Sequence, residues 1–155
     1  MSDSTIFQIA IDVAVRQRDS AQSSLALVAR NRLFAQGQMD QLTNYASETE
    51  SRWMASAQIS ANPELLKHHY QFMDRLRSAI DLQMSVLRGV DIQIGEAQKF
   101  LLSRQVRLRS LEVMLEKKQA AINAKRARRD QIQMDEFAAL QHARKRMQYT
   151  HGETL

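Results

Sequence analysis

The side chains best suited to catalysis or metal binding are the histidines, and they are few. The four are His68, His69, His142 and His151, and none lies at a metal-ligand spacing from a second histidine on the same helix face. Cysteine is absent, and no glycine-rich phosphate loop, nucleophile elbow or paired-carboxylate pocket is indicated. We therefore expect no catalytic residue, metal, cofactor or small-molecule substrate, and the sequence predicts a protein that is not an enzyme.

A run of cations gives the strongest signal for binding. No acid occurs from residue 117 to 129, where the cations are Lys117, Lys118, Lys125, Arg126, Arg128 and Arg129. The chain carries a formal net charge of +5 with a pI near 9.9, which indicates an acidic partner surface. The helix dipole favours cations only in the last turn, so it does not explain this run. The alternative interpretation is a solvated charged face without a partner.

A second group gathers the aromatic and bulky apolar side chains in the middle of the sequence. Its members are Leu42, Tyr45, Trp53, Phe72, Met73 and Leu76. Two interpretations remain open: the wider end of a helix–helix seam, or a docking patch that such a seam covers incompletely.

These groups must be positioned by helices, and Asn62-Pro63 divides the helical sequence in two. Pro63 is the only proline, and no glycine lies between Gly37 and Gly89. Proline fits the first position of a helix, and Asn62 is a favourable N-cap before it. We predict a break followed by a new helix, with a kinked continuous helix as the alternative.

Before the break, a ladder of positions advances by alternating steps of four and three residues. It consists of Ala14, Arg18, Ala21, Leu25, Val28, Arg32, Ala35, Met39, Leu42, Ala46, Thr49 and Trp53. Nine of these twelve are apolar, and the mean step of 3.5 is the heptad period of a left-handed coiled coil. Phe7 and Ile11 extend the ladder towards the N-terminus. The first helix is predicted over about 5–58, with Asp3 or Ser4 as its cap.

After the break, a matching ladder predicts a second helix over about 63–147, following a turn at about 59–62 and preceding a tail at 148–155. Its positions are His69, Phe72, Leu76, Ala79, Gln83, Val86, Val90, Ile94, Ala97, Leu101, Arg104, Leu108, Leu111, Leu115, Lys118 and Ile122. Two four-residue steps meet at Val90, which predicts a stutter and a soft spot between Gly89 and Gly95.

The two ladders pair in an antiparallel arrangement, because the residue numbers of facing positions have a nearly constant sum. Trp53 faces His69, and Thr49 faces Phe72. Arg18 faces Arg104, which indicates either two snorkelling side chains or a site that receives a carboxylate from a partner. The fold class predicted is all-α: two long helices in an antiparallel coiled-coil hairpin, the second overhanging the first beyond about Glu116.

Composition agrees with a single coiled-coil domain over residues 1–155. Four glycines and one proline supply too few turns for a globular fold, and helix-forming residues are abundant. The apolar stretch from Ile6 to Val15 is not a signal peptide, because no basic residue precedes it and Asp12 interrupts it. We therefore expect a cytoplasmic protein, in agreement with the absence of cysteine.

Several segments resemble the flagellar type III export component FliJ, over about residues 6–140. They are Gln41-Leu42-xx-Tyr45, Tyr70-Gln71-Phe72-xxx-Arg75-Leu76-xx-Ala79-Ile80, Leu108-xx-Leu111-Glu112 and Gln133-Met134-Asp135-Glu136-Phe137-Ala138. The Tyr-Gln-Phe segment and the Met-Asp-Glu-Phe-Ala segment discriminate best, since a heptad pattern does not require them.

This resemblance implies a stalk that inserts one end into the hexameric export ATPase FliI, promotes its activity, reaches the export gate protein FlhA and escorts export chaperones. The implied ATPase-binding residues are Arg16, Arg18, Lys117, Lys118, Lys125, Arg126, Arg128 and Arg129. The implied gate-binding residues are Gln38, Leu42, Tyr45, Phe72, Leu76, Ala79 and Gln83. It further implies peripheral association with the inner face of the cell membrane.

Two alternative functions remain: a basic protein that binds nucleic acid or anionic membrane, and a structural homo-oligomeric rod. Basic-zipper proteins carry their basic region next to a dimerising zipper, so a basic run at the far end of a hairpin argues against that mode of nucleic-acid binding.

Overall fold

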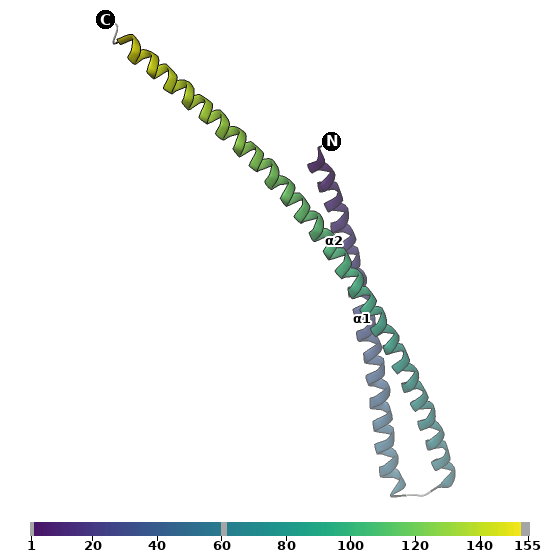
Figure 1. Ribbon diagram of the computed structural model, residues 1–155. Coiled ribbons are helices and arrows are strands. Elements are labelled where there is room, and N and C mark those ends of the chain that lie inside the picture. The colour runs from purple at the N-terminus through teal and green to yellow at the C-terminus, as the bar shows by residue number, and fades with distance from the viewer. Residues whose placement is uncertain (1, 60–61, 153–155) are drawn as a thin grey trace. The chain divides into compact units, whose positions relative to one another are not determined.

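Two helices make up the part of the chain that the computed structural model describes, residues 2–59 and 62–152. Helix α1 spans Asp3–Ala57 and helix α2 spans Pro63–Gly152, and no strand occurs among these residues (Figure 1). The helices pack against each other in opposite directions, and α2 is much the longer, with 90 residues against 55. The predicted all-α fold class, an antiparallel helical hairpin with an overhanging second helix, is confirmed.

Both helices begin with a side-chain cap. Asn62 Oδ1 accepts a hydrogen bond from the Glu64 N–H at 3.1 Å, which confirms Asn62 as the cap of α2. Helix α1 is capped by Ser2, whose Oγ accepts from the Thr5 N–H at 3.3 Å. The predicted caps Asp3 and Ser4 are therefore wrong, because both lie already inside α1. The predicted tail is wrong at residues 148–152, because α2 continues through them. Residues 60–61 of the predicted turn and residues 153–155 of the predicted tail lie outside the described residues.

By their contacts the residues fall into two compact units, each described here by itself. The hairpin unit is Val13–Arg107, and the terminal unit combines Met1–Asp12 with Leu108–Leu155. The sequence-based interpretation of residues 1–155 as a single coiled-coil domain stays a prediction.

In the hairpin unit, α1 contributes the predicted ladder to the seam. All twelve positions from Ala14 to Trp53 are buried or half-buried, and most of their neighbours in α1 are exposed. Ala14 and Ala21 are the most buried, at 2% exposure. Alanine at these levels lets the two backbones approach closely, so the seam is narrow there.

The α2 side of the seam differs from the predicted ladder at two levels. Phe72 and Val86 are exposed, at 37% and 44%, whereas Met73 is 5% exposed and Leu87 is half-buried. With Met73, Ile80 and Leu87 in the seam, the steps of four and three alternate without interruption; Ile80 and the predicted Ala79 are both half-buried. The predicted stutter is therefore wrong. Gly89 and Gly95 lie within an unbroken α-helix, and no described glycine has a positive φ.

Contacts between the helices confirm the antiparallel register. The rings of Trp53 and His69, a predicted pair, stack with centroids 4.5 Å apart and an interplanar angle of 9°. Farther from the turn, Gln83 Nε2 donates to the Ala35 carbonyl at 2.8 Å. The predicted pairing of Thr49 with Phe72 is not observed, because the Phe72 ring lies edge-on to Tyr45 instead, with centroids 5.9 Å apart.

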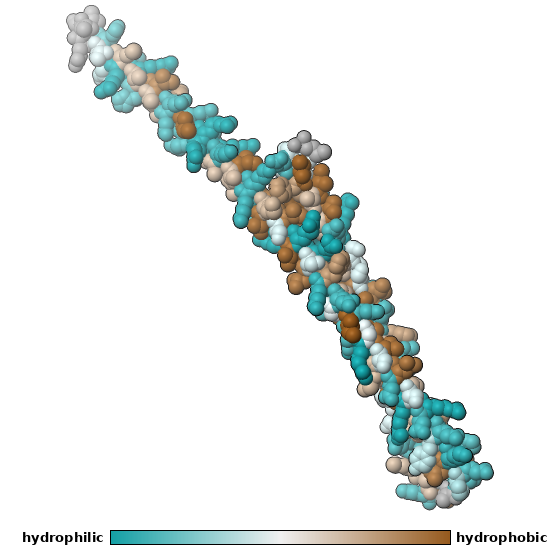
Figure 2. All heavy atoms as spheres, turned by 45° about the vertical axis from the view of Figure 1, so that its right-hand side comes forward, coloured by the Kyte–Doolittle hydropathy of each residue, from teal (hydrophilic) through white to brown (hydrophobic). Residues whose placement is uncertain are grey.

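In the terminal unit, the buried face of α2 continues as far as Ile122. Ile11 and Leu108 are buried at 8% and 5% exposure, and Phe7, Leu115 and Ile122 are half-buried. Every described residue from 123 to 152 is exposed. The part of α2 that leads to the C-terminus accordingly shows a mostly hydrophilic surface with isolated hydrophobic side chains (Figure 2).

Candidate functional site

Two surfaces carry the predicted binding residues. We name residues 117–129 of α2 the basic segment, and it belongs to the terminal unit. The second surface is a shallow groove in the hairpin unit, which we name the glutamine groove. It is lined by Gln38, Gln41, Leu42, Tyr45 and Gln83.

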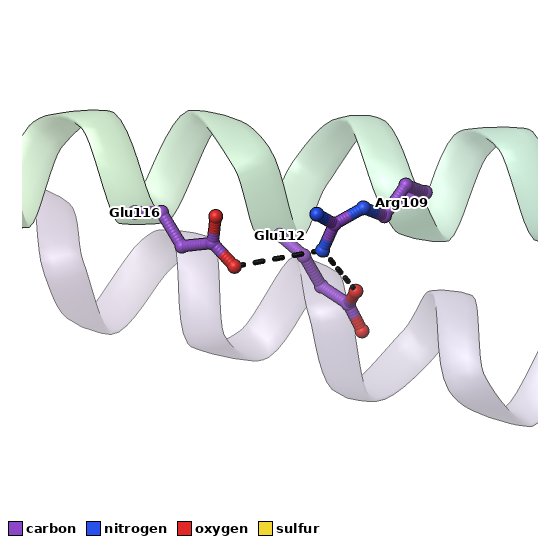
Figure 3. Close-up of polar contacts among 3 residues, drawn as sticks. All are labelled: Arg109, Glu112 and Glu116. Atoms are coloured by element: carbon purple, nitrogen blue, oxygen red, sulfur yellow. Dashed lines mark hydrogen bonds and ion pairs between the residues drawn. The ribbon is translucent and has the colours of Figure 1, made fainter.

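The basic segment begins directly after a small group of ionic side chains. Arg109 Nη1 lies 3.5 Å from Glu112 Oε2 and 3.5 Å from Glu116 Oε1, so one guanidinium lies between two carboxylates on the same helix (Figure 3). These side chains are 41–66% exposed, which keeps the energy of each contact small. Among the described residues, neither carboxylate forms an ion pair with a cation of the basic segment.

Lys118 differs from the other cations of the basic segment because it is held within the terminal unit. Its Nζ donates to Asp3 Oδ2 at 2.6 Å and lies 5.2 Å from the centroid of the Phe7 ring. The hydrogen bond from Lys118, together with its positive charge, lowers the pKa of the Asp3 carboxyl below its ordinary value of 3.8. The Lys118 side chain thus packs against Phe7 in the seam, and its ammonium group forms an ion pair with Asp3.

The other five cations of the basic segment are exposed, and none forms an ion pair with another described residue. They are Lys117, Lys125, Arg126, Arg128 and Arg129. At 100° per residue they cover about half of the helix circumference. A single helix that presents cations over so wide an arc is suited to an acidic surface that surrounds it, more than to one flat contact.

Arg16 and Arg18, the other two predicted ATPase-binding residues, lie in the hairpin unit. Arg16 is exposed, whereas Arg18 is half-buried and donates through Nε and Nη2 to Asp19 Oδ1, at 3.1 and 2.8 Å. The facing seam residue Arg104 lies over the Phe100 ring, with its Cζ 4.6 Å from the centroid. Arg18 thus turns to Asp19, as snorkelling predicts, whereas Arg104 keeps its Nε buried.

The glutamine groove brings together residues from both helices. Gln83 Nε2 reaches across the seam to the Ala35 carbonyl and also donates to Gln38 Oε1 at 3.3 Å. This bridge fixes two glutamine side chains at one end of the groove. The half-exposed ring of Tyr45, with Phe72 edge-on beside it, adds an apolar face. Such a combination of amides and aromatic rings is suited to a protein surface with both polar and apolar groups.

The predicted gate-binding residues divide into accessible and buried ones. Gln38, Tyr45 and Phe72 are exposed, and Leu42, Ala79 and Gln83 are half-buried. Leu76 is only 8% exposed and belongs to the seam core. Sequence reasoning omitted Gln41 from this set, although the Gln41-Leu42-xx-Tyr45 run contained the signal.

Sequence reasoning also missed the acids that satisfy seam cations. Asp3 was considered only as a helix cap, and its contact with Lys118 was not predicted. Arg32 was assigned to the seam without its partner Asp91, whose Oδ1 accepts from Arg32 Nε at 2.6 Å. Both contacts could have been predicted from the antiparallel register. In that register, Asp3 and Asp91 each lie within one residue of the position that faces the cation they contact.

Among residues 2–59 and 62–152, no group of three or more His, Cys, Asp or Glu side chains that could hold a metal ion occurs. Neither helix contains, in its described part, a stretch both long and apolar enough to cross a membrane.

Comparison with known proteins gives one match. A family model described as "Flagellar FliJ protein" matches residues 7–147, which is nearly the whole chain. No curated protein and no solved structure matches significantly.

Proposed function

The chain belongs to the flagellar FliJ family, and we propose that it is a non-enzymatic coiled-coil stalk that binds the export ATPase and the export gate. Membership of this family implies a role related to flagellar export. The finer proposal is that the basic segment contacts acidic residues of the ATPase ring and promotes its activity, while the glutamine groove contacts the gate. Export chaperones are proposed as further partners, and association with the membrane would be peripheral, through the gate.

One observation carries the ATPase assignment. Helix α2 continues for 30 residues after Ile122 with every described side chain exposed, and the cations Lys125, Arg126, Arg128 and Arg129 have no ion pair there. An isolated helix of this kind gains no stability from tertiary packing. A negatively charged partner that surrounds this helix would explain why it is both exposed and positively charged.

The proposal is tested by reversing three of these charges. The triple variant Arg126→Glu, Arg128→Glu and Arg129→Glu should abolish stimulation of the export ATPase at moderate salt. Because all three side chains are exposed, each substitution should change the free energy of unfolding by no more than about 0.5 kcal/mol. Circular dichroism would confirm that the helix content is retained.

A matched control carries the same three reversals elsewhere. Arg52, Lys67 and Arg75 are exposed cations of the hairpin unit, and none forms an ion pair with another described residue. Their reversal to Glu should leave stimulation intact. Stimulation that survives reversal of the basic segment, or that is lost equally in the control, would contradict the proposed contact.

The five unpaired cations would also suit a phosphate-rich partner, so nucleic acid and anionic membrane are the second candidates. Binding to phosphates releases counterions and therefore weakens steeply as salt increases. Titration with DNA, and with anionic vesicles, at two salt concentrations measures this slope. Tight, steeply salt-dependent binding without any ATPase stimulation would favour these candidates over the stalk. Light scattering of the isolated chain would test the third candidate, a homo-oligomeric structural rod.

A further inference from the structure

The seam of the hairpin unit contains arginines at two levels, and the two levels are satisfied differently. At the first, Arg32 of α1 donates to Asp91 of α2, so a guanidinium in the seam meets a carboxylate from the opposite helix. At the second, the register of the seam pairs Arg18 with Arg104, both half-buried, and Arg104 Nη1 lies 3.5 Å from Oε1 of Gln17, the residue before Arg18. We name this second level the arginine layer.

The arginine layer has fewer negative charges than positive ones. Asp19 accepts from Arg18, but no carboxylate contacts Arg104 among the described residues. The polar contact of Arg104 is to a neutral amide: its Nη1 lies 3.5 Å from Gln17 Oε1, at the limit of a hydrogen bond. Its Nε is buried and has no hydrogen-bond partner.

An unpartnered guanidinium N–H inside a seam is costly, since buried polar groups are almost always hydrogen-bonded. Like charges at one level of a coiled coil add repulsion. Arg107, three residues after Arg104, does not reduce this repulsion, because it is a further cation and forms no ion pair in the described part of the chain. The layer is therefore short of one anion.

Guanidinium groups bind two oxygens of a carboxylate or a phosphate through two parallel N–H donors, and the Nε edge supplies such a pair. In the present conformation the Arg104 Cζ lies over the Phe100 ring, and the Nε at this edge is buried. Rotation of the side chain away from Phe100 would expose Nε and the adjacent Nη towards a ligand. The neighbouring guanidinium of Arg18 would then stabilise the same negative charge.

We propose that the arginine layer binds an oxyanion, of the carboxylate or phosphate class, which does for Arg104 what Asp91 does for Arg32. This proposal does not rest on the proposed function, because it concerns the isolated chain. The oxyanion has two possible sources: free inorganic phosphate, or an acidic side chain of a protein partner.

The test is thermal unfolding of the full chain, followed by circular dichroism, in chloride and in inorganic phosphate at equal ionic strength and pH. At about ten times the dissociation constant, phosphate should raise the midpoint of the wild type by about 3–6 °C. Arg104→Met should show no such rise, and its midpoint without phosphate should exceed that of the wild type. Arg104→Lys, which keeps the charge but loses the planar donor pair, should show a smaller rise.

Arg107→Met is the matched control, because it removes an exposed arginine from the same turn of α2. It should retain the full effect of phosphate. An equal rise in Arg104→Met and the wild type would show a general salt effect and would overturn the proposal.

A second experiment replaces phosphate by hexaglutamate. Stabilisation of the wild type by hexaglutamate alone would identify the acidic side chain as the source, and an effect of neither probe would also overturn the proposal.

Discussion

Truncation of two adjacent residues in α2 tests the register of the seam. Met73 is 5% exposed, and the neighbouring Phe72 is 37% exposed with its ring edge-on to Tyr45. Met73→Ala removes a buried side chain, which costs about 2–5 kcal/mol in protein cores. A two-helix seam can partly close over the lost volume, so we expect a value near the lower end, about 2 kcal/mol. Phe72→Ala loses the aromatic contact, worth about 1 kcal/mol, and the partial burial of the ring, but it leaves no closed cavity because the side chain is already 37% exposed.

The measurement is urea unfolding of both variants, followed by circular dichroism and by the fluorescence of Trp53, the only tryptophan. The midpoint of Met73→Ala should lie clearly below that of Phe72→Ala. Helix propensity works in the same direction, because alanine replaces a poorer helix former at position 72 than at position 73. If Phe72→Ala proves the more destabilising, the observed register is wrong at this end of the hairpin unit and the interrupted ladder is restored. Leu87→Ala and Val86→Ala repeat the comparison near the middle of α2.

Two more expectations concern the ends of the seam and the glutamine groove. Lys118 holds the pKa of Asp3 below 3.8, so this contact stabilises the fold above that pH and is lost as the pH falls through the lowered pKa. An NMR titration should therefore find the Asp3 midpoint below 3.8 in the wild type and close to it in Lys118→Met; equal midpoints would refute the contact. In the groove, Tyr45→Ala should weaken capture of the export gate protein, whereas Leu33→Ala, which truncates a 72% exposed residue of the same helix outside the groove, should not. Unchanged capture by Tyr45→Ala would remove the groove from the proposed gate contact.

The ladder of α1 was predictable because a single apolar face runs through it. Between Ala14 and Trp53 the heptad positions stand apart from mostly polar neighbours, so the period alone identifies them. In α2 the same method failed where two apolar residues are adjacent, at Phe72-Met73 and at Val86-Leu87. Periodicity cannot choose between such neighbours.

The polar contacts were less predictable than the seam, for a different reason. The sequence indicated that Arg18 and Arg104 share a level, but not that one would turn to Asp19 and the other to Phe100. Long side chains reach several neighbours at similar cost, and small differences in local packing decide between them. The cations of the basic segment, by contrast, were identified from sequence because no acid interrupts residues 117–129.

The central claim of this account is that the basic segment binds the export ATPase. The most direct measurement is capture of the purified export ATPase by the full chain, comparing three proteins at moderate salt: the wild type, the triple reversal at Arg126, Arg128 and Arg129, and the control reversal at Arg52, Lys67 and Arg75. We predict capture by the wild type and the control, and loss of capture by the basic-segment variant. Equal capture by all three proteins, or no capture by the wild type, would contradict the claim.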